Sequence, residues 1–393
     1  MAPGAPTAAR MKTSLCLTIF SLCVASGHAD DRIMVEGAMV NGAPVRMAFD
    51  TGADEIYFFS SAPERLHLKV SPVRNIWGQN LGPATEKCAV QFWGFSQKQR
   101  VRVLAAAPFA SCDCDALDGL VGWQAVSGKV LVFDTASNTV HFVREVPKEA
   151  SQWTKLPLRF WDLTLVLKVP DHARTGFIVI DTGSESGLGL PPQSWREWRA
   201  AHASQPVTLH AFFMPATEGI MVREQAWASD FKLGSLSLTD IVVEEADPVS
   251  VRSASRKHTA TLGLAALKRL DLIVDGRNDV AYLRPKTTPP PPCVHNRAGA
   301  VFVPPDKESD ALTARVVDGG PAYEAGIRDG DVLLKIEEHD VTNWRTATNK
   351  PSAFWKQPAG TQLALTLQRS NQTFRTTIML RDILLPTTAI TGP

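Results

Sequence analysis

The stretch RMAFDTGADEIYF, from Arg46 to Phe58, places Asp-Thr-Gly directly after an apolar run. The same arrangement returns in GFIVIDTGSESGL, from Gly176 to Leu188. A single Asp-Thr-Gly is a common tight turn, because Asp and Gly both favour such bends. Two copies, each at the end of an apolar strand, predict that the chain builds the same loop twice.

The two loops belong to a longer internal repeat. Each is followed, at nearly the same distance, by Pro-Ala-Thr-Glu, then by a short segment ending in glycine, and finally by two strands around a polar turn. The glycine segments are Leu120-Val121-Gly122 and Thr261-Leu262-Gly263, and the strand pairs are VLVFDTASNTVHF, ending at Phe142, and LDLIVDGRNDVAYL, ending at Leu283. Four matched features in one order indicate a duplication.

Val-, Ile- and Phe-rich segments dominate this region, so we expect a mainly β fold. Helical patterns are sparse, and the best candidates are Pro191–His202 and Leu264–Asp271.

The repeat suggests a chemistry for the aspartates. If the two halves pack about a pseudo-twofold axis, the carboxyl groups of Asp50 and Asp181 meet there. Carboxyl groups about 3 Å apart cannot both ionise cheaply, so such a pair holds one proton over a broad pH range. The ionised member activates a water and the protonated member polarises a peptide carbonyl. The titration belongs to the pair, so the sequence assigns neither role to either residue.

The region from Ile33 to Leu283 resembles the aspartic proteases. AFDTGAD is similar to the retroviral-type active-site loop, and VIDTGSE is similar to the pepsin-type loop. The resemblance implies two retropepsin-like β-barrel lobes in tandem, over residues 30–148 and 149–284. It also implies catalytic roles for Asp50 and Asp181. The supporting loop residues are then Thr51, Gly52, Thr182, Gly183 and Ser184, with the two threonines hydrogen-bonded across the axis.

Two features depart from that family. Trp77-Gly78 stands where the pepsin-type flap has Tyr-Gly, so Trp77 is either a flap residue or part of the core. Ala53 stands where pepsin-type loops have a hydroxyl, which Ser184 supplies in the second loop.

Four consecutive prolines mark residues 285–298 as a semi-rigid linker. Beyond it, Gly320-Pro321-Ala322, Ala325-Gly326-Ile327 and Gly330-Asp331-Val332-Leu333 make residues 299–383 resemble a small α+β PDZ domain of the bacterial protease-associated type, with 384–393 as a tail. The resemblance implies binding of peptide C-termini by β-augmentation. The residues it implicates are Gly299, Ala300, Val301, Phe302 and Phe354. A PDZ fold that packs on the protease and binds no ligand is the alternative.

The N-terminal residues 1–29 resemble a secretory signal peptide, with Lys12, an apolar run from Leu15 to Val24 and small residues near Ala29. An uncleaved anchor is the alternative, although the run is short for a membrane span. We therefore expect an exported protein, periplasmic or secreted, without a membrane span after cleavage. Cys88, Cys112, Cys114 and Cys293 remain, either as free thiols or with one bridge from Cys88 to Cys112 or Cys114.

The net charge of +1 argues against a nucleic-acid partner. The histidines show no metal-ligand spacing, and no cofactor or metal is expected. The sequence therefore predicts an aspartic endopeptidase that acts on polypeptides recruited by a PDZ domain. The main alternative is a non-catalytic exported adaptor that binds peptides, and a single active lobe that dimerises is a third interpretation.

Overall fold

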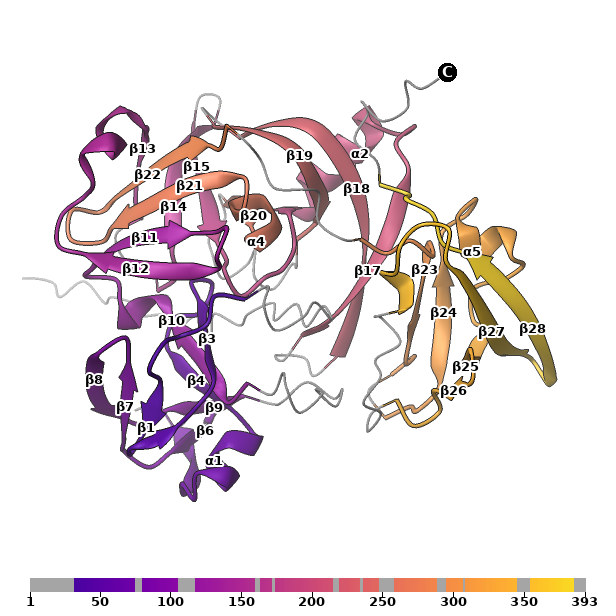
Figure 1. Cartoon of the computed structure of the whole chain (residues 1–393), viewed down its shortest axis with the longest axis horizontal. Helices are drawn as coiled ribbons and strands as arrows, with labels where there is room; N and C mark the ends of the chain where they lie inside the picture. Colours follow the sequence, from indigo (N-terminus) through magenta and orange to yellow (C-terminus); the bar gives the residue numbers. More distant parts are fainter. Residues whose placement is uncertain are drawn as a thin grey trace, which may run out of the picture.

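A computed structural model describes residues 32–74, 80–104, 117–159, 163–171, 174–214, 219–233, 236–246, 258–287, 295–306, 308–344 and 354–384 (Figure 1). The fold is mainly β, as the sequence predicted. The predicted signal peptide lies outside the described residues. Within the described part of the chain, no helix is both long and apolar enough to cross a membrane.

The first half contains a six-stranded sheet of order β3-β10-β4-β9-β6-β5. Its strands are β3 (Met47–Asp50), β10 (Gly119–Gly122), β4 (Ile56–Phe59), β9 (Arg102–Leu104), β6 (Asn80–Thr85) and β5 (Val70–Arg74). A second sheet, of order β2-β1-β7-β8, contains β2 (Ala43–Pro44), β1 (Met39–Val40), β7 (Cys88–Phe92) and β8 (Phe95–Gln99). Helix α1 (Ser61–Arg65) follows β4.

The second half repeats the six-stranded arrangement and adds one strand, giving β14-β15-β20-β16-β19-β18-β17. These strands are β14 (Val166–Asp171), β15 (Arg174–Ile180), β20 (His258–Leu262), β16 (Leu188–Leu190), β19 (Leu236–Glu245), β18 (Gly219–Leu233) and β17 (Val207–Met214). From β15 onward, successive pairs are parallel, antiparallel, parallel, antiparallel and antiparallel. The first sheet has the same series from β3 onward. Strand order and direction therefore support the duplication inferred from sequence.

The predicted helices are present but shorter than expected. Helix α2 spans Pro192–Ala201 and buries Trp195, whereas α4 spans only Leu264–Leu267. Two 3-10 helices, Trp123–Ala125 and Lys148–Gln152, also occur in this region.

A five-stranded sheet joins the two halves, in the order β12-β11-β21-β22-β13. Its strands are β12 (Thr139–Val143), β11 (Val130–Asp134), β21 (Leu270–Asp275), β22 (Val280–Pro285) and β13 (Thr154–Pro157). The two predicted turns are built alike, since Asp134 Oδ1 and Asp275 Oδ1 each accept two N–H groups from the residues that follow. One hydrophobic core runs through both halves. The described sheets are open, however, so the expectation of closed β-barrels was wrong.

The C-terminal region contains a sheet of order β23-β24-β25-β27-β28, with β26 paired to β25. Its elements are β23 (Ala300–Val303), β24 (Leu312–Val316), α5 (Pro321–Glu324), β25 (Val332–Ile336), β26 (His339–Asp340), β27 (Gln362–Arg369) and β28 (Gln372–Met379). The region has its own core but does not stand apart (Figure 1). Edge strands β23 and β17 contact each other, and Val301 packs against Leu209. The proline-rich segment was expected to act as a semi-rigid spacer. The contact between β17 and β23 shows that the C-terminal region nevertheless packs against the second half.

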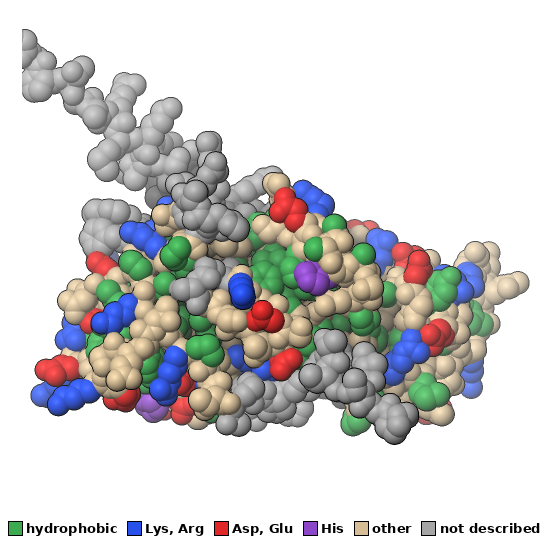
Figure 2. Space-filling model, turned by 90° about the horizontal axis from the view of Figure 1, so that it is seen from above, with side chains coloured by type: hydrophobic (Ala, Val, Ile, Leu, Met, Phe, Trp, Pro, Cys, Tyr) green, Lys and Arg blue, Asp and Glu red, His purple; other side chains and the backbone are tan. Residues whose placement is uncertain are grey.

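Charge is dispersed on the face that Figure 2 shows. On the face shown in Figure 2, the described Lys and Arg side chains are interspersed with Asp and Glu and form no continuous basic patch. Both signs of charge are therefore mixed on this face, in keeping with the net charge of +1.

Candidate active site

Asp50 and Asp181 both lie where a buried strand ends. Asp50 closes β3, whose four residues are all buried, and it pairs with Gly122 of the parallel strand β10. Asp181 follows β15, and its N–H donates to Leu262 O of the parallel strand β20 at 2.9 Å. The exposed fractions are 1% for Asp50 and 7% for Asp181. Apolar strands therefore hold both carboxyl groups inside the protein.

The two threonines connect the loops through reciprocal hydrogen bonds. The hydroxyl of Thr51 donates to Ile180 O at 2.6 Å and accepts the N–H of Thr182 at 3.1 Å. The hydroxyl of Thr182 donates to Phe49 O at 2.8 Å and accepts the N–H of Thr51 at 3.0 Å. Each hydroxyl thus satisfies two backbone groups of the opposite half, as the sequence predicted.

The glycines show how closely the carboxyl groups approach the opposite loop. A Cβ atom at Gly52 would lie 2.6 Å from Oδ1 of Asp181. A Cβ atom at Gly183 would lie 2.3 Å from Cγ of Asp50. Both separations are far below van der Waals contact, so any larger residue at either position would displace a carboxyl group. The structure therefore brings the two predicted motifs together.

Backbone N–H groups hold each carboxyl group in place. Ala53 N–H donates to Oδ1 of Asp50 at 3.1 Å. Gly183 and Ser184 donate to Oδ1 of Asp181 at 3.0 and 3.1 Å. The buried Oδ2 of Asp50 receives no well-formed hydrogen bond from the described residues, and the neighbouring Asp181 can supply a donor only when it is protonated.

Burial raises the pKa of both carboxyl groups, and the charge of Asp50 adds to the rise at Asp181. Burial raises the pKa of Asp50 to about 6, against hydrogen bonds from Asp181 and from loop N–H groups that lower it. Burial also raises the pKa of Asp181 well above its ordinary range, and the charge of Asp50 raises it further. The pair is therefore suited to hold one proton, with the form protonated on Asp181 favoured.

The glycine segments support the loops from below. Trp123 N–H, next to Gly122, donates to Ala53 O at 2.7 Å. Leu264 N–H, next to Gly263, donates to Ser184 O at 2.7 Å. The backbone also approaches closely at the glycine before each of these residues. A Cβ at Gly122 would lie 2.3 Å from Glu55 O, and one at Gly263 would lie 2.4 Å from Ser186 O, so neither position has room for a side chain.

Ser184 was predicted to offer its hydroxyl to Asp181. In the structure its N–H makes that contact, while its hydroxyl lies 2.7 Å from the hydroxyl of Ser186. Sequence reasoning missed Ser186, and it also missed Asp54, which accepts the hydroxyl of Tyr57 at 2.5 Å below the first loop. Both residues follow the motif within a few positions, so a closer reading of the loop sequences could have found them.

The flap candidates Trp77 and Gly78 lie outside the described residues. The strands on either side, β5 and β6, pair antiparallel, as expected for a hairpin. Cys88 is buried and forms no disulfide with a described residue, and Cys112, Cys114 and Cys293 lie outside that part of the chain. The described residues contain no cluster of His, Cys, Asp and Glu that could hold a metal.

The predicted peptide-binding edge of the C-terminal region is covered. Gly299, Ala300, Val301 and Phe302 are all buried. The side-chain amide of Asn296 donates to Ala300 O at 2.7 Å and to Leu209 O of β17 at 3.0 Å. The aromatic ring of Phe302 lies 5.2 Å from that of Trp355, whereas Phe354 lies beside His339.

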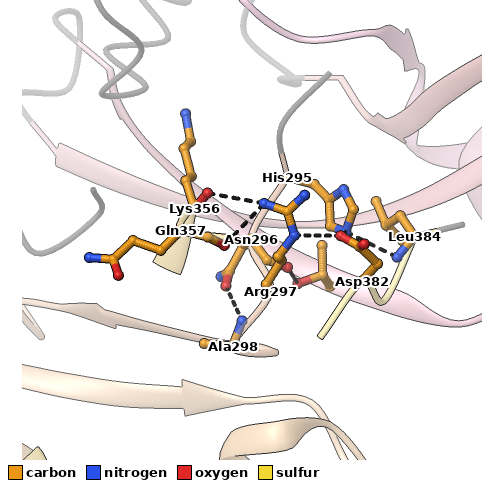
Figure 3. A network of polar contacts seen from close by, with 9 residues as sticks. His295, Asn296, Arg297, Ala298, Lys356, Gln357, Asp382 and Leu384 are labelled. Atoms are coloured by element: carbon orange, nitrogen blue, oxygen red, sulfur yellow. Dashed lines mark hydrogen bonds and ion pairs between the residues drawn. The ribbon is translucent and has the colours of Figure 1, made fainter. Parts of the chain in front are cut away.

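The loop before this edge is also bonded within the chain (Figure 3). The guanidinium of Arg297 pairs with Asp382 and donates to Lys356 O and Gln357 O. The Ala298 N–H donates to Asn296 Oδ1 at 2.9 Å, and the Arg297 N–H donates to Trp355 O at 2.9 Å. These N–H groups are therefore engaged already, and they cannot take a peptide carboxylate without rearrangement.

No protein-family model and no curated protein matches the chain. Any assignment of function therefore rests on the repeat, the motifs and the geometry of the two aspartates.

Proposed function

We propose that the chain is an aspartic endopeptidase built from two tandem retropepsin-like lobes. The observation that carries the proposal is the contact between the loops, in which each glycine faces the carboxyl group of the opposite Asp-Thr-Gly. Reciprocal threonine bonds and the repeated strand order support the same interpretation.

The proposed reaction uses the proton shared by the pair. Ionised Asp50 takes a proton from a water molecule, and the water oxygen attacks the peptide carbonyl carbon. Protonated Asp181 donates to the carbonyl oxygen, which gives a neutral gem-diol. Asp50, now protonated, gives its proton to the amide nitrogen, and Asp181 takes a proton from one gem-diol hydroxyl as the C–N bond breaks. The acid and the amine are released, and the pair returns to its starting state. The raised pKa values favour this division of roles, since Asp181 holds the proton more tightly.

The adaptor alternative is less well supported. Burying two carboxyl groups, which raises the pKa of both, costs folding free energy. A reaction would account for that cost, whereas an adaptor has no need of it. The test is cleavage of an unfolded protein by the purified chain, followed by mass spectrometry of the fragments. We expect cleavage that a statine-type inhibitor blocks and that is absent from Asp181→Asn. Equal cleavage by the wild type and Asp181→Asn would favour a contaminating protease and remove the proposal.

Recruitment of substrate C-termini by the PDZ-like region is a separate part of the proposal. Because β17 covers the edge strand β23, the two strands must separate before a peptide can pair with β23. A labelled peptide with an apolar C-terminus should therefore bind weakly to the wild type and at least tenfold more tightly to Leu209→Asp, which weakens the β17 contact. Equal binding to both would show that this edge does not take the peptide. Export to the periplasm or the medium is inferred from the signal-peptide pattern alone and stays a prediction.

A further inference from the structure

A buried chain of hydroxyl groups leads away from the second aspartate. Ser184 N–H donates to Oδ1 of Asp181 at 3.1 Å, and the Ser184 hydroxyl lies 2.7 Å from that of Ser186. The Ser186 N–H also donates to the Ser184 hydroxyl, at 3.3 Å. Both serines are buried, so water contributes little to holding their side chains in place.

The chain ends on Glu244, a carboxyl group with an exposed fraction of 5%. The Ser186 hydroxyl hydrogen-bonds to it. The side-chain amide of Gln225 donates to Oε2 of Glu244 at 2.7 Å, and Nδ1 of His210 lies 3.4 Å from the same oxygen. Burial tends to raise the pKa of Glu244, but these partners outweigh it and the pKa lies below its usual range. Glu244 is therefore a buried anion that depends on its donors.

Strand pairing places Glu244 beside the active-site loop. Gly187 leads from the loop directly into β16, and Gly189 of β16 pairs with Glu244 in the parallel neighbour β19. Gln225 is the direct cross-strand partner of Glu244 on the other side, in β18. The pairing of β19 with β16 and β18 therefore fixes the backbone of Glu244 next to the loop, and its carboxylate can contact loop residues.

The first half shows that the fold itself does not need this carboxylate. The pairing of β4 with β10 and of β16 with β20 makes Tyr57 the counterpart of Gly189, and the parallel partner of Tyr57 in β9 is Arg102. Ala53 and Glu55 stand in place of the two serines. The matching position in the duplicated sheet is thus held by a half-buried arginine, and a buried glutamate there calls for a reason specific to the second loop.

We propose that Glu244 is a positioning residue for Asp181. Held by Gln225 and His210, it fixes the Ser186 hydroxyl and, through Ser184, the N–H that orients the Asp181 carboxyl group. The inference rests on the proposed peptidase function, and it adds a set of residues that act on the pair without touching the substrate.

The experiment compares Ser186→Ala with Ser186→Thr in the full-length protein. Ser186→Ala removes the link while leaving Glu244 with Gln225 and His210. We expect kcat to fall roughly 10- to 30-fold with KM within about threefold, because a small misplacement of a catalytic group lowers the rate of the chemical step. Ser186→Thr keeps the hydroxyl and should restore kcat to within about threefold of wild type.

Ser237→Ala is the matched control. It removes a hydroxyl that donates to the Asp230 carboxylate at 2.7 Å on the same hairpin, away from the active-site loop. This variant should keep the wild-type kcat. A Ser186→Ala enzyme with unchanged kcat, or a kcat lowered equally in Ser186→Ala and Ser237→Ala, would overturn the inference.

A second measurement does not depend on catalysis. Amide hydrogen exchange in peptides that cover residues 181–187 should be at least fivefold faster in Ser186→Ala and in Glu244→Gln than in wild type, because the loop loses its tether. Ser237→Ala should not change it. If the wild type cleaves no peptide, the proposed function fails while exchange still decides the inference. Unchanged exchange in both variants would reject the positioning role even in an active enzyme.

Discussion

The loop that begins at Asp50 and the loop that begins at Asp181 share their backbone hydrogen bonds but differ in the side chains that support them. In both loops the residue three positions after the aspartate donates its N–H to Oδ1, at 3.1 Å in each case. Below the first loop, Asp54 accepts the hydroxyl of Tyr57. Below the second, Ser186 hydrogen-bonds to Glu244.

This difference indicates which features the duplication fixed and which diverged later. The backbone frame brings the carboxyl groups together and is the same in both halves. The two carboxyl groups are not equivalent, since burial raises the pKa of both and the charge of Asp50 raises that of Asp181 further. A symmetric pair has no preferred site for its proton, whereas this pair has one.

The largest expected effect comes from removing either carboxyl group. Asp50→Asn and Asp181→Asn should each lower kcat by more than about 10³-fold, and the double variant should lower it little further, because the pair acts as a unit. Peptide cleavage by the purified variants measures this. Considerable activity in one single variant would mean that only one loop carries the chemistry.

The pH dependence should be the next largest effect. Asp50 must be ionised, so the rate rises as the pH rises through about 6, the pKa that burial gives Asp50. Asp181 must be protonated, so the rate falls at higher pH, as the pH passes its raised pKa. Cleavage of a short peptide at pH 4 should be roughly 100-fold slower than near pH 6.5. An optimum at pH 3 to 4 would contradict this assignment of roles.

The threonine bonds test the part of the frame that the two loops share. Thr51→Val and Thr182→Val each leave one buried N–H and one buried carbonyl without a partner. Each should lower the free energy of unfolding by roughly 2–3 kcal/mol. Denaturant unfolding measures the loss. Thr313→Val, which removes a single half-buried bond to Val303 O, is the control and should cost about 1 kcal/mol or less. Unequal losses in Thr51→Val and Thr182→Val would show that the frame is not shared equally.

The smallest effect concerns the position where the loops differ directly. Ala53→Ser adds a hydroxyl next to Asp50, and a donor to the ionised carboxylate lowers its pKa. The acidic limb of the pH–rate profile should therefore move toward lower pH by about half a unit. A limb that does not move would mean that the new hydroxyl, like that of Ser184, takes another partner.

The sequence predicted the features that local motifs determine. Asp50, Asp181 and the crossed threonines were found because the repeat places them at matching strand ends. Glu244 was missed because its contact with Ser186 depends on the pairing of β16, β18 and β19, which neighbouring residues do not reveal. Whether the sheets close and whether β23 packs on β17 likewise depend on strands that are distant in sequence. The proline-rich segment limits how far apart the regions it connects can lie, but it does not determine whether they touch.

The central claim is that one carboxyl group from each half forms a single site. Calorimetric titration with a statine-type inhibitor tests this most directly, because the inhibitor hydroxyl replaces the attacking water between the two carboxyl groups. The account predicts one inhibitor bound per chain, with binding weakened at least 100-fold in both Asp50→Asn and Asp181→Asn. Binding that either substitution leaves unchanged, or one inhibitor for every two chains, would contradict it.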